Sequence, residues 1–177
     1  MQKLIMLGMI TLIVTNVHSV AAQNSQPYAG QQTRQIKALS ASEVEGLLAG
    51  KGLGMAKPAE LNQYPGPKHV LEVVEQLDLT AQQIQQTRLF FKQMQAEAIP
   101  LGEQIVAAEK KLDELFASGR VTNKDLEKAL DEIAKLRGRL RFVHLKTHLR
   151  QKAIMSAEQV HRYIQLRGYG PQHQHQH

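Results

Sequence analysis

The sequence predicts an all-α protein built on one long antiparallel helical hairpin with short flanking helices. Between Thr80 and Phe116 the apolar residues recur at alternating intervals of three and four, the heptad pattern of a helix that packs along a second helix. With Thr87 admitted, this seam consists of Ile84, Thr87, Phe91, Met94, Ala98, Leu101, Ile105, Ala108, Leu112 and Leu115. Roughly 35 helical residues at about 1.5 Å each give a rod of about 50 Å. We therefore expect an elongated protein.

The second arm of the hairpin follows a break at Ser118, Gly119 and Arg120. Its apolar positions are Leu126, Leu130, Ile133, Leu136, Leu140 and Val143. A seam this narrow must be covered by another helix, and this stretch supplies one. Pro100 removes one backbone donor inside the first arm, so we expect a kink just before it without a break.

The ends of the predicted helices carry capping residues. Thr80 with Gln83 forms a capping box at the start of the first arm, and Thr122 followed by Asp125 caps the second. Ser156 with Gln159 forms a further capping box, which predicts a last helix that ends at Arg167 and Gly168.

The region before the hairpin is punctuated by glycine and proline. Ser40 with Glu43 opens a short helix that stops at Gly50, and a helix from His69 to Leu77 leads into the hairpin. The alternating glycines in 50–54 suggest a phosphate-binding loop, but no strand precedes them and the Lys-Ser/Thr ending of a P-loop is absent. We interpret this segment as a turn that packs Leu53 and Met55 on a neighbour.

The first 22 residues have the form of a cleavable secretory signal. Lys3 precedes an uncharged apolar run of about 14 residues, and small residues follow it up to Ala22, after which we expect cleavage. The run is too short to span a bilayer comfortably. The sequence therefore predicts an exported protein with the organisation 1–22 signal peptide, 23–68 polar leader with a short helix and a Gly/Pro-rich linker, 69–169 helical domain and 170–177 His/Gln tail.

The composition excludes several functions. The 177 residues contain no cysteine, so disulfides, thiol catalysis and thiolate metal sites are absent. Removal of Lys3 with the signal leaves 21 basic and 16 acidic residues, a moderately basic balance of +5 that attracts anionic partners. Export argues against nucleic acid as that partner. No nucleophile is paired with a base, so we expect no enzymatic activity.

Two similar stretches carry a resemblance to a known family. Leu79, Thr80 and Gln83 match the Leu-Thr-x-x-Gln motif, and the stretch with Met155, Ser156 and Gln159 repeats it with two replacements. With these motifs, the region from about Val70 to Tyr169 resembles the Spy/CpxP-like superfamily of exported bacterial stress proteins, including the periplasmic heavy-metal sensors. The resemblance implies an all-helical, usually dimeric, periplasmic protein without enzymatic activity that acts in envelope or metal stress.

One candidate metal site lies on the second arm. His144 and His148 are four residues apart, so their imidazoles share one helix face and are close enough to clamp a metal. Folding the hairpin about residue 120 makes Met94 and Glu97 the nearest additional ligands, and Met155 falls on the same side if the helix extends that far. This combination of a His-x-x-x-His pair with a carboxylate and a thioether resembles the ligand set of the metal-sensing relatives. The alternative is two histidines that merely lie over the edge of the seam.

A second candidate metal site is the C-terminal tail, where His173, His175 and His177 alternate with glutamine. Mobile imidazoles bind Zn(II), Cu(II) or Ni(II) loosely, and a purification tag is the alternative explanation. No metal is expected to be required as a cofactor.

The second arm is also strongly basic. The candidate client-binding residues are Arg137, Arg141, Lys146 and Arg150. Such a run is often only a solvated face, but apolar residues between the charges suit loose binding of unfolded chains, as the resemblance to chaperones implies. The sequence therefore predicts an ATP-independent holdase with transition-metal binding capacity. The alternative is a metal sensor that signals to a membrane-bound sensor or anti-sigma regulator.

Overall fold

The computed structural model describes residues 26–170, and all of its regular structure is helical. The chain divides after Gln32 into two compact units. Residues 26–32 of the first unit form turns, in which the Gln31 side chain donates to the Pro27 carbonyl at 3.0 Å. The signal peptide predicted at 1–22 and the histidines predicted as tail ligands lie outside the described residues.

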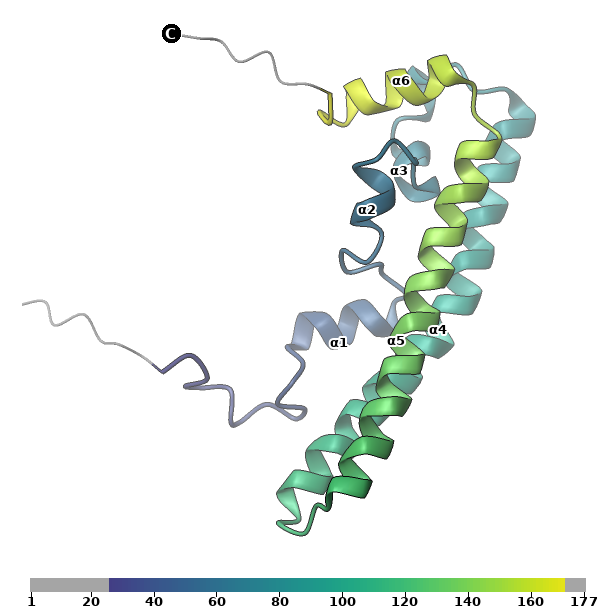
Figure 1. Ribbon diagram of the computed structural model, residues 1–177. Helices are drawn as coiled ribbons and strands as arrows, with labels where there is room; N and C mark the ends of the chain where they lie inside the picture. The colour runs from purple at the N-terminus through teal and green to yellow at the C-terminus, as the bar shows by residue number, and fades with distance from the viewer. Residues whose placement is uncertain (1–25, 171–177) are drawn as a thin grey trace, which may run out of the picture. The chain divides into compact units, whose positions relative to one another are not determined.

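The second unit, from Thr33 onward, contains every helix that the structure describes (Figure 1). In chain order these are α1 (Ala41–Leu48), α2 (Lys57–Glu60), α3 (Pro67–Glu72), the 3₁₀ helix η1 (Val74–Gln76), α4 (Ala81–Ala117), α5 (Asn123–Ala153) and α6 (Ala157–Leu166). None of these helices combines the length and the apolar character that crossing a membrane requires.

The two long helices pack along each other and run in opposite directions from a short turn. Arg137 of α5 donates to Glu109 of α4 at 2.6 Å, and Gln151, farther from the turn, donates to Thr87 at 3.1 Å. Gly119 in the turn has a φ of +65°, a conformation that favours glycine. The all-helical fold and the pairing of two long helices are thus as the sequence predicts.

The capping residues begin the helices where the sequence places them. Thr80, Thr122 and Ser156 accept hydrogen bonds from backbone N–H groups in the first turns of α4, α5 and α6. Helix α4 continues through Pro100 without a break. The predicted helix 69–77 differs, because it is divided into α3 and η1, with Val73 between them.

The main core lies between α4, α5 and the segment that precedes them. Leu39 and Leu47 from that segment are buried with Ala98 and Ile105 of α4 and Leu140 of α5. Gly102 of α4 makes the close approach of α1 possible, since a Cβ there would lie 2.0 Å from the Leu47 carbonyl oxygen. Residues 33–68, interpreted from the sequence as leader and linker, are therefore part of the folded unit.

A second, smaller core joins α3 and the segment between η1 and α4 to α6. It buries Val70 and Leu77 with Tyr163 and Ile164, and Leu79 and Met155 pack against this cluster. Figure 1 shows α1, α2 and α3 on one side of the α4–α5 pair and α6 near the end remote from the turn. The candidate site lies in a pocket that is lined mainly by the segment 49–69, α4 and α5.

Candidate functional site

His144 and His148 share one face of α5 and are both buried, with 6% and 8% of their surfaces exposed. Two glycines from the segment between α1 and α3 lie against their rings. A Cβ at Gly52 would be 3.4 Å from Nδ1 of His144, and one at Gly66 would be 2.7 Å from Cε1 of His148. Because any side chain at position 66 would collide with the imidazole, glycine allows this segment to cover the histidines.

The imidazole of His148 has a defined orientation. Its Nδ1 lies 2.7 Å from the carbonyl oxygen of Tyr64, which can only accept, so Nδ1 carries the proton and donates. When the ring is neutral, the lone pair is on Nε2. Metal-binding histidines are commonly oriented by a carbonyl or carboxylate in this way.

Glu60 of α2 is a buried member of this site that sequence reasoning missed. Its side chain accepts a hydrogen bond from the hydroxyl of Tyr163, and its other oxygen, Oε2, lies 3.6 Å from Nδ1 of His148. Oε2 is buried without a hydrogen-bond partner among the described residues. Burial, together with the bond to Glu60, raises the pKa of Tyr163 far above its usual value. The sequence offers no signal for Glu60, because a four-residue helix shows no hydrophobic period.

His144 is neutral at pH 7. Burial, with a smaller contribution from the nearby His148, lowers its pKa from 6.5 to about 4. Its Nε2 is buried and has no hydrogen-bond partner in the part of the chain that the structure describes. A neutral imidazole has a lone pair available, as metal ligation requires.

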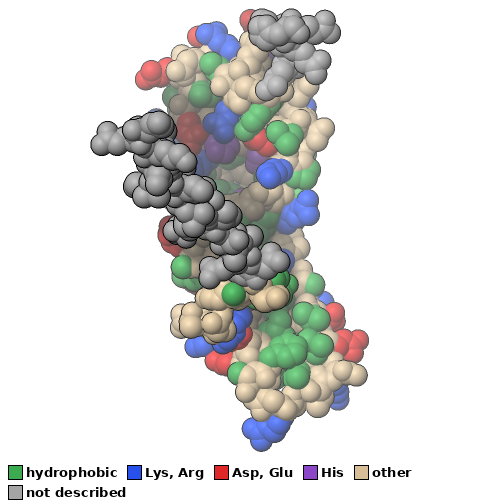
Figure 2. All heavy atoms as spheres, turned by 90° about the vertical axis from the view of Figure 1, so that its left-hand side faces the viewer, with side chains coloured by type: hydrophobic (Ala, Val, Ile, Leu, Met, Phe, Trp, Pro, Cys, Tyr) green, Lys and Arg blue, Asp and Glu red, His purple; other side chains and the backbone are tan. Residues whose placement is uncertain are grey.

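The two histidines lie in a pocket of about 690 Å³ (Figure 2). Segment 49–69 covers one side of it, α4 contributes Phe91 and Met94, and α5 contributes Thr147 beside the histidines. Of the ligands predicted from the sequence, Met94 therefore shares the pocket with His144 and His148. Figure 2 shows histidine side chains inside the hollow and basic side chains beside it.

Two other predicted ligands lie elsewhere. Glu97 forms an ion pair with Lys146 at 2.6 Å and does not line the pocket, and Met155 packs against the smaller core near α6. Within residues 26–170, no group of three or more histidine or acidic side chains is arranged to hold a metal ion. A metal held by the histidine pair would need further ligands from solvent, from Met94 or from a rearranged Glu60.

The outer face of α5, defined by Arg139, Phe142, Lys146 and Leu149, points away from the core. The spacing of three and four residues places these side chains on one side of the helix. Phe142 and Leu149 are 63% and 58% exposed. The ammonium group of Lys146 lies 5.7 Å from the centre of the Phe142 ring. No acidic residue occurs between positions 133 and 157, so the charged side chains that α5 itself contributes here are basic, and one of them, Lys146, pairs with Glu97 of α4 at 2.6 Å.

The predicted client-binding residues have different environments. Arg137 pairs with the buried Glu109, and Lys146 pairs with Glu97. Arg150 is exposed and lies over the ring of Phe90 at 4.2 Å. Arg141 is also exposed.

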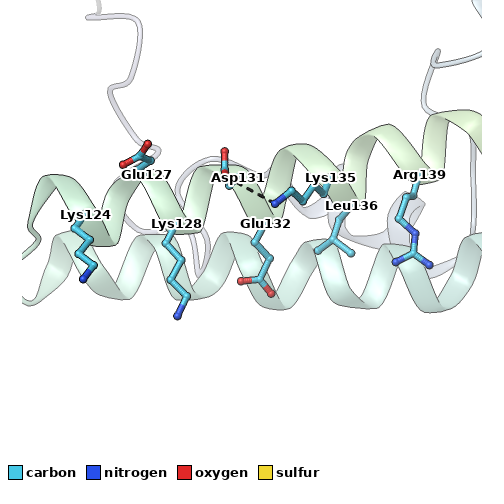
Figure 3. A pocket seen from close by; sticks show the side chains of 8 residues that line it. All are labelled: Lys124, Glu127, Lys128, Asp131, Glu132, Lys135, Leu136 and Arg139. Carbon is cyan, nitrogen blue, oxygen red and sulfur yellow. Dashed lines mark ion pairs between the residues drawn. The ribbon is translucent and has the colours of Figure 1, made fainter.

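A shallow groove nearer the turn is lined by α5 alone (Figure 3). Its lining is mostly charged and contains both signs, with Lys135 and Asp131 paired at 3.9 Å. Exposed pairs of this kind contribute little binding energy or stability. The groove is therefore a solvated face of one helix and carries no site.

The two motif copies found in the sequence meet in space. Gln83 of the first copy donates to Gln159 of the second at 2.9 Å and to the Ile154 carbonyl at 2.6 Å. Gln159 in turn donates a hydrogen bond to the carbonyl oxygen of Asp78, which precedes α4, at 3.1 Å. Each glutamine also accepts from the backbone N–H of its own capping residue. The repeated motif thus joins the starts of α4 and α6 through one hydrogen-bonded pair of side-chain amides.

Comparisons of the chain with protein-family models, with curated proteins and with solved structures found no match.

Proposed function

We propose that this protein is a non-enzymatic, ATP-independent holdase of the periplasmic stress-protein type suggested by its motifs. The observation that carries the proposal is the outer face of α5, where Phe142 and Leu149 are exposed on a helix whose nearby charged residues are basic. Burial of such a side chain against a partner contributes about 1.5–3 kcal/mol. Two of them suit weak, reversible binding of an unfolded chain.

The charges of this face complement the proposed role. Arg139 is exposed beside the apolar side chains and attracts acidic segments of a client, whereas the charge of Lys146 is already paired with Glu97. Unfolded chains expose apolar and charged groups together, and this surface can contact both. We further propose that export is directed by residues 1–22 and that the protein acts as a homodimer, without nucleic acid as a partner.

Suppression of client aggregation without nucleotide tests the holdase function. We expect equimolar protein to suppress the aggregation of an unfolding client, and the double variant Phe142→Ser/Leu149→Ser to lose most of that effect. The matched control is Phe116→Ser/Leu130→Ser, which removes two other exposed apolar side chains. No suppression by the wild-type protein up to tenfold excess would exclude the function, and equal loss in both variants would exclude the outer face.

A second candidate function is that of a metal sensor for a membrane-bound regulator, and one observation favours it. His148 is oriented by the Tyr64 carbonyl with its Nε2 lone pair available, beside the neutral His144. Binding of Zn(II), Ni(II) or Cu(II) here would bridge α5 and the covering segment if Glu60 turned toward the metal. Such a link would couple ligation to the position of that segment.

Calorimetric titration of the chain truncated after Tyr169, which removes the tail histidines, tests the sensor. We expect micromolar binding that is lost in His144→Ala/His148→Ala and retained in His161→Ala, whose imidazole is exposed on α6. Unchanged circular dichroism would show that the double variant is folded. Binding that persists without His144 and His148 would rule out this site.

A further inference from the structure

The pocket over α4 and α5 has the size and lining of a small-molecule site. Its volume of about 690 Å³ falls within the roughly 300–1,000 Å³ typical of such sites. Its apolar lining comes from Phe91 and Met94 on α4 and from Leu53 and Pro67 on the covering segment. A ligand of matching shape would therefore bury an apolar body here.

The deep end of the pocket disfavours an anionic group. Glu60 is the one carboxylate among the residues that line the cavity, and its Oε2 is buried without a hydrogen-bond partner among the described residues. Tyr163 donates its hydroxyl to Glu60 and so holds that carboxylate in place. An anion placed beside it would be repelled in a buried setting, where charge interactions are strong. The inner part of a ligand is thus expected to be uncharged.

The mouth of the pocket has the opposite character. Lys51, Lys57 and Lys68 line it and are exposed. Lys51 and Lys68 have acidic neighbours, Glu45 at 2.9 Å and Glu72 at 4.0 Å, but neither of these carboxylates lines the pocket. Lys57 has no ion-pair partner among the described residues, and the contact of Lys68 is long, so the mouth attracts an anion and repels a cation.

The glycine loop at the mouth adds hydrogen-bond donors. Gly50 and Gly54 have φ angles of +63° and +80°, which glycine adopts readily. The backbone N–H groups of Gly52, Leu53 and Gly54 donate no hydrogen bond to any described residue. Loops of this kind, with successive free N–H groups, commonly bind anions.

We propose that this pocket binds an amphiphilic organic anion, with its apolar body between Phe91 and Met94 and its charged head at Lys57, Lys68 and the glycine loop. A carboxylate and a phosphate monoester are both anions whose oxygens accept hydrogen bonds, which is the chemistry that the mouth recognises. The site lies on the opposite side of α5 from Phe142 and Leu149, so it is independent of the proposed client surface.

Titration of the full chain with decanoate, decyl phosphate and decyltrimethylammonium, each below its micelle concentration, tests this site. Labelled methionine methyl groups report the position of binding. We expect both anions to shift the Met94 signal at a stoichiometry of one and to leave Met155, in the other core, unshifted. Acetate, which has the charge but no apolar body, should not bind. The relative affinities of decanoate and decyl phosphate identify the preferred head group.

The variant Lys57→Glu/Lys68→Glu should weaken decanoate binding by about tenfold or more. Its matched control, Lys124→Glu/Lys128→Glu, makes the same change of charge on exposed residues of α5 near the turn and should bind as the wild type does. Equal binding of decyltrimethylammonium, equal weakening in both variants, a shift confined to Met155, or no binding would each overturn the proposal.

Discussion

Replacement of Gly102 by alanine should destabilise the protein, although alanine is the better helix former. In α4 the new Cβ would lie 2.0 Å from the Leu47 carbonyl oxygen, and ordinary contact begins near 3.4 Å. The backbones of α1 and α4 would have to separate by more than an ångström. Overpacking typically costs about 1–3 kcal/mol, and a rigid backbone contact favours the upper end of that range. The gain in helix propensity offsets roughly 1 kcal/mol of this cost.

We therefore expect Gly102→Ala to lower the free energy of unfolding by about 2 kcal/mol, or the midpoint of thermal unfolding by roughly 4–8 °C. Gly138→Ala is the matched control, because Gly138 lies inside α5 and a Cβ there would meet no atom within 4 Å. That variant should gain up to about 1 kcal/mol. Urea and thermal unfolding followed by circular dichroism measure both. If Gly102→Ala were as stable as the wild type, α1 would not pack on α4 as described.

Three further predictions concern buried polar groups. In a double-mutant cycle, Gln83→Ala and Gln159→Ala should show a coupling of about 1 kcal/mol, and additive effects would contradict the amide pair that joins α4 to α6. The pKa of His144 is about 4 in the folded protein and 6.5 in the unfolded chain. The contribution of the neutral imidazole to stability is therefore complete above pH 6.5 and is lost as the pH falls toward 4. This loss is roughly 3 kcal/mol at most. His144→Leu should flatten the dependence of unfolding free energy on pH, and an unchanged slope would argue against burial. Tyr163→Phe should destabilise by about 1–3 kcal/mol, because Glu60 loses its donor; a neutral effect in urea unfolding would show that the contact is unimportant.

The long helices were predictable because their signals are local. Thr80 with Gln83 and Ser156 with Gln159 lie within single turns, and their capping boxes form as the sequence indicates. The seam of α4 repeats over many turns, so its period is clear despite Pro100. Phe90, which the predicted seam leaves out, is buried, whereas Phe91 of the predicted seam is half-buried and lines the pocket.

The composition of the candidate site could be predicted only in part. The spacing of His144 and His148 places them together, and Met94 follows from folding the chain about the turn. The position of Glu60 depends instead on how residues 33–68 fold back over α5. The helices of that region are four to eight residues long, and helices this short show no clear hydrophobic period. Gly66 looks like any turn glycine in the sequence, and its close contact with His148 emerges only when the chain is folded.

Site-specific photo-crosslinking tests the proposed client surface most directly. The chain has no cysteine, so Leu149→Cys and Phe116→Cys each give a single site for a benzophenone label at similarly exposed positions, 58% and 56%. With a permanently unfolded, carboxymethylated client, illumination should crosslink the label at position 149 and leave the label at position 116 largely unreacted. Equal crosslinking at the two positions, or crosslinking only at position 116, would contradict client binding by the outer face of α5.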